Sequence, residues 1–156
     1  GIAEEHFFSA FLRNKLGARL HHESHRSRGN KILVSCFPGE YHELGVLLFS
    51  IAALGHGYQM LYLGTNLPLS QLSKVVERTD VSAVLLSGTG VGVWQKAVEA
   101  ELKTIISSMK IPVLFGGELS ETYREKLESL GGHVLGSDHV KAMENMEAIF
   151  PAFSRT

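Results

Sequence analysis

The chain has 156 residues, of which 44% are hydrophobic and 20% are charged, and its formal net charge is −1. Such a chain can bury the core of one small domain without disulfides, and its single cysteine, Cys36, excludes an internal one. A net charge close to zero gives no extended positive potential to attract phosphates, so we expect no direct nucleic-acid binding by this segment. No apolar run approaches the roughly 20 residues that span a bilayer, and no signal peptide opens the chain. We therefore expect a cytoplasmic protein without membrane contact.

The first predicted element is an amphipathic helix from Ile2 to Leu20. Its apolar side chains recur at helical spacing: Phe7, Phe8, Phe11, Leu12, Leu16 and Leu20. No Ser, Thr, Asp or Asn precedes the helix as a cap, which indicates the last helix of a larger, truncated bundle. We assign residues 1–22 to this helix and the polar residues 23–30 to a linker. The linker's histidines are predicted to be solvated, because structural zinc needs four convergent ligands on a rigid scaffold.

Residues 31–156 are predicted to form one domain in which short strands alternate with helices. The strands are expected at residues 32–34, 58–63, 81–86, 111–115 and 133–135. These runs lack polar alternation, as strands do when helices cover both faces of a parallel sheet. We predict an α/β fold with a doubly wound, five-stranded parallel sheet in the flavodoxin-like order 2-1-3-4-5. Ser70 and Ser120 are candidate helix caps, and Trp94 is expected to begin the helix after the third strand.

His42 lies where the first strand turns into a helix predicted over residues 43–54. In the predicted strand order this is the switch point, where open α/β sheets bind ligands. Glu40 is close enough to accept a hydrogen bond from one ring nitrogen and to leave the other oriented toward a metal. Gly45 allows a ligand to approach the start of the helix. The three residues together predict a ligand site with His42 as its metal-binding group.

The pattern Glu40-x-His42-x-x-Gly45 resembles the cobalamin-binding signature Asp/Glu-x-His-x-x-Gly. In that family a Ser-x-Leu motif and a Gly-Gly pair follow, and here Ser87-Gly88-Thr89 and Gly116-Gly117 come at the ends of the third and fourth predicted strands. Thr89 stands where the family usually has leucine. The glycines from Gly88 to Gly92 do not make a dinucleotide loop, since Val93 breaks the G-x-G-x-x-G spacing.

The resemblance implies cobalamin bound base-off, with the histidine replacing the cofactor's own base below cobalt. It assigns His42 as the metal ligand, Glu40 as the group that holds the imidazole, and Gly45 as the site of close approach. The nucleotide tail is then accommodated by Ser87, Thr89, Gly116 and Gly117. The expected consequence of Thr89 is altered packing around that tail.

Residues 5–13, EHFFSAFLR, resemble the end of the four-helix bundle that lies above the corrin in MerR-type, light-sensing transcriptional regulators. The resemblance implies that Glu5 and His6 face the upper ligand; the alternative is an exposed helical pair. It further implies a sensory domain and no enzyme activity, with adenosylcobalamin as the expected form and methylcobalamin or hydroxocobalamin as alternatives. The parent protein would carry the missing bundle helices and a DNA-binding domain.

Two other functions suit the same predicted fold. Corrinoid methyl carriers and mutase domains usually carry Gly-Asp-x-His-Asp-x-Gly-Lys around the histidine, whereas this chain has PGEYHELG at residues 38–45. A haem-binding sensor is also compatible, because an imidazole in an apolar crevice suits iron. His56, His133 and His139 are expected at the surface. The sequence leaves the oligomeric state open, with a homo-oligomer among the alternatives.

Overall fold

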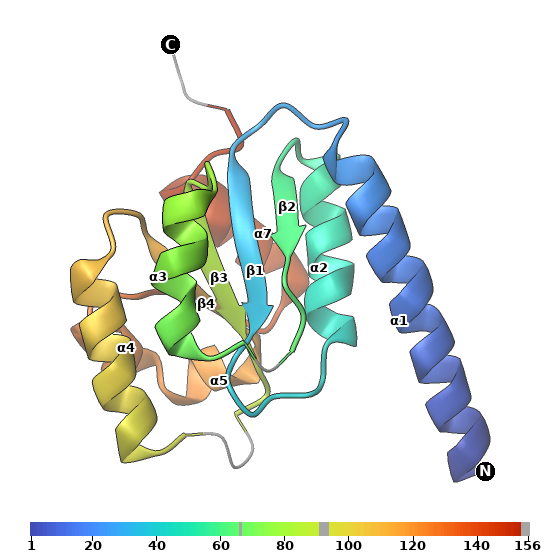
Figure 1. Ribbon diagram of the computed structural model, residues 1–156, viewed down its shortest axis with the longest axis horizontal. Helices are drawn as coiled ribbons and strands as arrows, with labels where there is room; N and C mark the ends of the chain where they lie inside the picture. Colours follow the sequence, from blue (N-terminus) through green and yellow to red (C-terminus); the bar gives the residue numbers. More distant parts are fainter. Residues whose placement is uncertain (66, 91–93, 154–156) are drawn as a thin grey trace.

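The computed structural model describes residues 1–65, 67–90 and 94–153 (Figure 1). Asn66 and residues 91–93, which include Gly92 and Val93 of the glycine-rich stretch, lie outside the described residues. The strands are β1 (Lys31–Cys36), β2 (Gln59–Tyr62), β3 (Ala83–Ser87), β4 (Val113–Gly116) and β5 (His133–Gly136). They form one parallel sheet in the order β2-β1-β3-β4-β5. The predicted fold class and strand order are confirmed.

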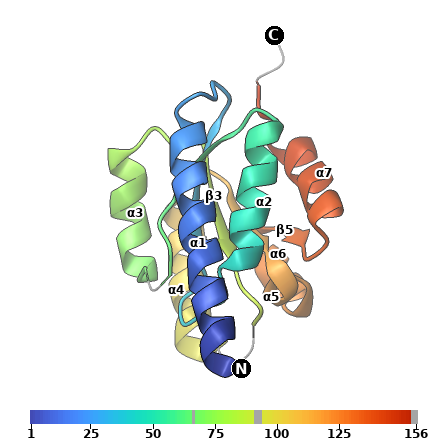
Figure 2. The same cartoon turned by 90° about the vertical axis from the view of Figure 1, so that its right-hand side faces the viewer.

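Helices cover both faces of the sheet, as the apolar strands require. The helices are α1 (Ile2–Ser24), α2 (Leu44–Gly55), α3 (Leu69–Arg78), α4 (Lys96–Ser108), α5 (Gly117–Thr122), α6 (Arg124–Ser129) and α7 (His139–Ile149). Figure 2 shows α3 and α4 on one side of the sheet and α2 and α7 on the other. In β1, Ile32 and Val34 point to the core beneath α2 and α7, while Leu33 points to the core beneath α3 and α4.

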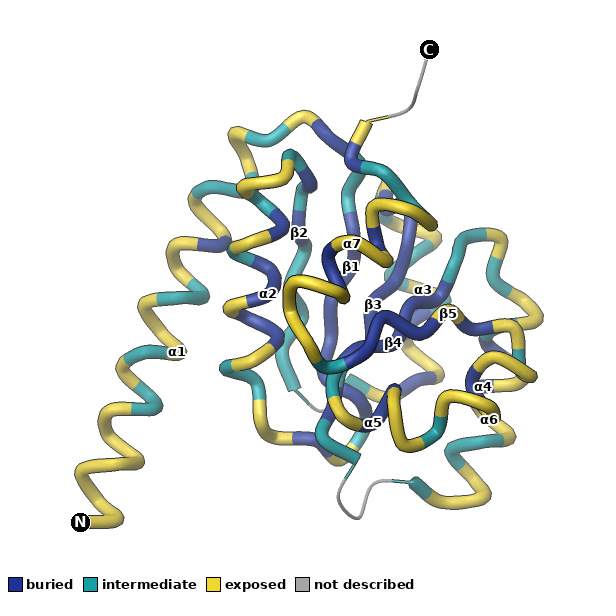
Figure 3. The backbone as a smooth tube through the Cα atoms, turned by 180° about the vertical axis from the view of Figure 1, so that it is seen from behind, coloured by how far each residue is buried: buried dark blue, intermediate teal, exposed yellow. Residues whose placement is uncertain are grey.

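The sheet is almost completely shielded from solvent. Figure 3 shows that β1, β3, β4 and β5 are mostly buried, that the edge strand β2 is mostly half-buried, and that the helices are exposed on their outer surfaces. Leu33, Val84 and Phe115 have no exposed surface. Burying an apolar side chain of this size contributes about 1.5–3 kcal/mol. These two cores hold the strand ends in place, and the candidate ligand site is built on those ends.

The first helix continues to Ser24, beyond the predicted boundary at residue 22. The predicted linker over residues 23–30 therefore starts too early. The Ser24 hydroxyl donates to the carbonyl oxygen of Met60 at 2.7 Å and accepts from its N–H at 2.8 Å, which ties the last turn of α1 to the edge strand β2. Only Leu20 of α1 is buried, and Phe7 and Phe8 are 74% and 60% exposed.

Two predicted helix caps are wrong. Helix α3 begins directly after Pro68, so Ser70 lies inside its first turn. The fixed φ of Pro68, −61°, suits the entry to a helix. Ser120 lies inside α5, where its hydroxyl donates back to the carbonyl oxygen of Gly117 at 2.7 Å. At α7, by contrast, the carboxylate of Asp138 caps the helix by accepting the N–H of Lys141.

Trp94 lies before α4 and does not begin it, because the helix starts at Lys96. Its ring stacks with that of Tyr123 at a centroid distance of 4.3 Å and with that of Phe37 at 6.0 Å. Tyr123 also separates α5 from α6. Across residues 1–65, 67–90 and 94–153, no helix combines the length and the apolar character that crossing a membrane requires.

Candidate functional site

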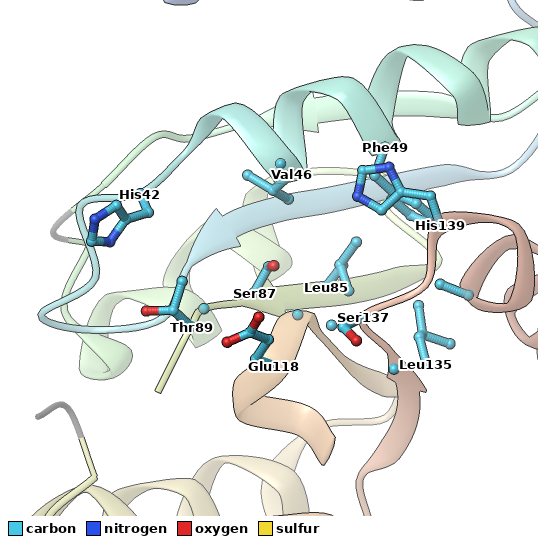
Figure 4. A pocket seen from close by; sticks show the side chains of 16 residues that line it. His42, Val46, Phe49, Leu85, Ser87, Thr89, Glu118, Leu135, Ser137 and His139 are labelled. Atoms are coloured by element: carbon cyan, nitrogen blue, oxygen red, sulfur yellow. The ribbon is translucent and has the colours of Figure 1, made fainter. Parts of the chain in front are cut away.

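A cavity of about 220 Å³ opens at the carboxyl ends of β3, β4 and β5, beneath α2 and α7. The fold brings six of the predicted site residues to its wall: His42, Gly45, Ser87, Thr89, Gly116 and Gly117. They meet because parallel strands end at one edge of the sheet, and the switch point between β1 and β3 leaves a crevice there. Figure 4 shows His42 and Thr89 toward one end of the cavity and His139 toward the other.

Glu40 lies beneath His42 and is the most completely enclosed polar group of the site, with 2% of its surface exposed. One carboxylate oxygen is 2.6 Å from the His42 Nδ1 atom and 3.0 Å from the His42 backbone nitrogen. The other accepts the N–H of Thr89 at 2.7 Å and its hydroxyl at 2.8 Å. The side chain of His42 is 79% exposed, so its Nε2 edge is open to a ligand.

The pKa of Glu40 is lowered to about 2. Burial by itself disfavours the charged carboxylate, but the hydrogen bonds from Thr89 and His42 together outweigh it. Glu40 is therefore an acceptor at neutral pH, which places the proton of a neutral His42 ring on Nδ1 and leaves the Nε2 lone pair for a metal.

Glycines keep the cavity and its entrance open. A Cβ on Gly116 would lie 3.5 Å from Leu85 Cδ1 and 3.7 Å from Ser87 Oγ. These are ordinary van der Waals distances, but Leu85 and Ser87 both line the cavity, so the added atom would occupy space beside its wall. At Gly117, where φ is +78°, a Cβ would lie 2.3 Å from the carbonyl oxygen of Gly88. Only glycine fits there. A Cβ on Gly45 would meet nothing within 4 Å, so the space beside the start of α2 is free.

Several wall residues were missed by sequence reasoning. They are Val46, Phe49, Glu118, Leu135, Ser137 and His139. Ser137 directly follows β5, so the strand-end rule that selected Ser87 could have found it. His139 was expected only as a surface residue; its side chain is exposed, yet it lines the cavity and its ring lies edge-on to Phe49 at 5.9 Å.

Glu5 and His6 do not belong to the cavity. Both are exposed on the first turns of α1 and neither lines the cavity wall. The structure therefore leaves the predicted contact with an upper ligand as a prediction. In the described ranges, no group of three or more His, Cys, Asp or Glu side chains could hold a metal ion.

Cys36 lies behind the site and is buried, 1% exposed. Its Sγ is 3.7 Å from the hydroxyl of Tyr62, which in turn donates to the carboxylate of Glu43. Burial raises the pKa of the Cys36 thiol to about 11. The thiol is consequently a packing group and not a nucleophile at neutral pH.

The sequence has two relatives among characterised bacterial repressors. It is 25% identical over 149 residues to the HTH-type transcriptional repressor CarA of Myxococcus xanthus, and 27% identical over 135 residues to CarH of the same organism. The matches cover 96% and 85% of this chain. The chain is a homologue of CarA and CarH. It spans about half the length of these relatives, 50% and 44% respectively, and no family model matches it.

The chain also shares its fold with cobalamin-binding proteins of known structure. A cobalamin-binding protein from Desulfitobacterium hafniense superposes with a TM-score of 0.57 at 18% identity, covering 78% of this chain and 58% of that one. The methanol:cobalamin methyltransferase complex MtaBC from Methanosarcina barkeri superposes with 0.64 at 16% identity, covering 79% and 46%. The monomethylamine corrinoid protein of M. barkeri gives 0.61 at 13% identity, covering 86% and 64%. At these identities the likeness concerns the fold alone.

Proposed function

We propose that this chain binds cobalamin base-off, with Nε2 of His42 as the lower ligand of cobalt and the nucleotide tail in the cavity. The observation that carries the proposal is the contact between Glu40 and His42 at the cavity mouth. A buried carboxylate 2.6 Å from Nδ1 leaves the exposed opposite edge of the imidazole as a free metal donor. The glycines in the cavity wall beside His42 leave space for the nucleotide tail, which also supports the proposal.

The size of the cavity is consistent with holding only the nucleotide tail, with the corrin ring outside. Pockets that enclose a drug-sized ligand usually measure about 300–1,000 Å³. At about 220 Å³, this cavity is suited to one part of a large cofactor. The corrin ring would lie outside it, against His42 and the free space beside Gly45. Haem is less well supported as an alternative, because it has no tail to fill the cavity and needs an enclosing pocket for its ring.

The relatives support a regulatory role over an enzymatic one, since both are transcriptional repressors. On this proposal the chain is the sensory part of a cytoplasmic regulator, and DNA is bound by another part of the parent protein. Adenosylcobalamin is the proposed form, and when bound it would supply a light-labile carbon–cobalt bond. The residues of this chain would hold the lower face and the tail. Under the alternative of a methyl carrier, methylcobalamin would occupy the same site.

Replacing His42 tests the proposal directly. His42→Ala should weaken or abolish the binding of hydroxocobalamin, measured by its absorbance change and by ultrafiltration. The matched control is His56→Ala, because His56 is also an exposed histidine 2.6 Å from a carboxylate, that of Glu147, but lies outside the cavity. In the Co(II) form, the nitrogen splitting of the EPR spectrum should change when the protein carries 15N-labelled histidine, because the cofactor's own base is unlabelled, and His42→Ala should abolish this dependence on the label. Equal binding by both variants, or no spectral change with the unaltered chain, would reject His42 as the ligand.

A further inference from the structure

Thr89 gives Glu40 two of the four hydrogen bonds that the described residues provide. Its backbone N–H and its hydroxyl both reach the same carboxylate oxygen, at 2.7 and 2.8 Å. The other oxygen receives the N–H and the ring nitrogen of His42. The two oxygens therefore face opposite directions, one toward the loop after β3 and the other toward His42.

The Glu40 side chain has little room to rotate. A Cβ on Gly88 would lie 3.2 Å from the carboxylate oxygen that Thr89 binds and 3.2 Å from Phe37 Cβ, so the carboxylate packs directly against the Gly88 backbone. Carboxylate rotation would break the Thr89 contacts and the His42 contact together. Loss of a hydrogen bond from Thr89 should therefore loosen the carboxylate and, with it, the orientation of the His42 imidazole.

His42 depends on this contact for its orientation. Its side chain is 79% exposed, and among the hydrogen bonds of the described residues its ring takes part only in the one with Glu40. An exposed ring without that bond would rotate freely and exchange its proton between the two nitrogens. Orientation of the ring must come from the carboxylate and from whatever holds the carboxylate.

We propose that Thr89 is a positioning residue, whose hydroxyl fixes the Glu40 carboxylate and through it the orientation and tautomer of His42. The role rests on the proposed function, in which Nε2 of His42 binds cobalt. It assigns to the Thr89 side chain a task that packing against a nucleotide tail would not require. A hydroxyl bound to a carboxylate is a strong, charge-assisted contact, so its removal should be measurable.

The first test uses the protein without cofactor. Two-bond proton–nitrogen NMR spectra, recorded well above the ordinary histidine pKa of about 6.5, distinguish the two ring tautomers. His42 is assigned by comparison with His42→Gln. The unaltered protein should show the proton on Nδ1, and Thr89→Val, which keeps the shape but loses the hydroxyl, should shift the ring toward a mixture. Thr89→Ser keeps the hydroxyl and should resemble the unaltered protein.

A threonine elsewhere supplies the control. The Thr79 hydroxyl donates to the carbonyl oxygen of Val75 at 2.8 Å, at the end of α3, so Thr79→Val removes a comparable hydrogen bond away from the cavity. It should leave the His42 signals unchanged. An unchanged tautomer in Thr89→Val would overturn the proposal, and so would equal shifts in Thr89→Val and Thr89→Ser or a shift in Thr79→Val.

The second test adds hydroxocobalamin. Thr89→Val should lower its affinity by less than the roughly 10–100-fold expected for loss of a direct partner of a metal-binding histidine. Thr89→Ser should restore most of that loss. Failure of the unaltered chain to bind any cobalamin would reject the proposed function, while the tautomer comparison would still decide the positioning role of Thr89.

Discussion

Arg13 on α1 forms an ion pair with Glu43, its Nε lying 3.0 Å from a carboxylate oxygen. Glu43 directly follows His42 and precedes the first residue of α2. Its other carboxylate oxygen accepts the hydroxyl of Tyr62 from the end of β2. The first helix is thus joined to the segment that carries the proposed cobalt ligand.

The two partners of Glu43 should differ in their contribution to stability. The Arg13 side chain is 46% exposed, so Arg13→Ala should lower the free energy of unfolding by less than about 1 kcal/mol. Tyr62→Phe removes the hydroxyl that donates to the Glu43 carboxylate, whose side chain is only 12% exposed, and should cost about 1–3 kcal/mol. Urea unfolding of both variants measures the difference. A larger loss in Arg13→Ala would mean that the ion pair, and not the tyrosine contact, dominates.

Stability should decrease in acid through Glu40. The pKa of this carboxyl is about 2 in the folded protein and 4.5 without its contacts, so its contribution is complete above about pH 5 and is lost as the pH falls toward 2. The lost stability amounts to at most about 3 kcal/mol. Glu40→Gln should flatten the dependence of the unfolding free energy on pH over this interval. Glu77→Gln, at an exposed residue of α3, is the control and should retain the slope of the unaltered protein.

Substitution of Gly45 should separate stability from binding. A Cβ at Gly45 meets nothing within 4 Å, so Gly45→Ala should stabilise the cofactor-free protein by up to about 1 kcal/mol through helix propensity. The new methyl group should weaken cobalamin binding, because Gly45 lines the cavity mouth. Gly55→Ala is the matched control, since Gly55 lies on the same helix, also has open space around it and is absent from the cavity wall. Equal affinity of both variants would place the corrin away from α2.

Glu40 and His42 should differ in how much affinity they provide. Glu40→Gln retains a side chain of the same size, but its amide cannot match the charged acceptor, and a loss on the order of 10–100-fold is expected. His42→Ala removes the metal donor itself and should lose more. Titration with hydroxocobalamin, followed by absorbance, compares the two variants. Equal losses would show that the roles of the two residues are misassigned.

Local sequence patterns sufficed for the sheet and for placing several candidate site residues at one of its edges. The run Ile32–Val34 and its counterparts are apolar throughout, and such runs are stable only between two layers of helices. Strand ends of a parallel sheet share one edge, so His42, Ser87 and Gly116 could be placed near one another from their positions after strands. The caps failed because a serine near a helix start can bind a carbonyl within the first turn, as Ser120 does.

The Glu40–His42 contact follows from a spacing of two residues, but only the tertiary structure decided which side chains from different segments of the site touch. Cys36 pairs with Ser87 in the register of β1 and β3, and this pairing brings Thr89 to Glu40 across 49 positions of sequence. The approach of His139 to Phe49 likewise depends on the packing of α7 beside α2. Spacing rules describe residues on one helix or strand. Hydrogen bonds between loops form only after two hydrophobic cores have set the distance between the strands that carry them.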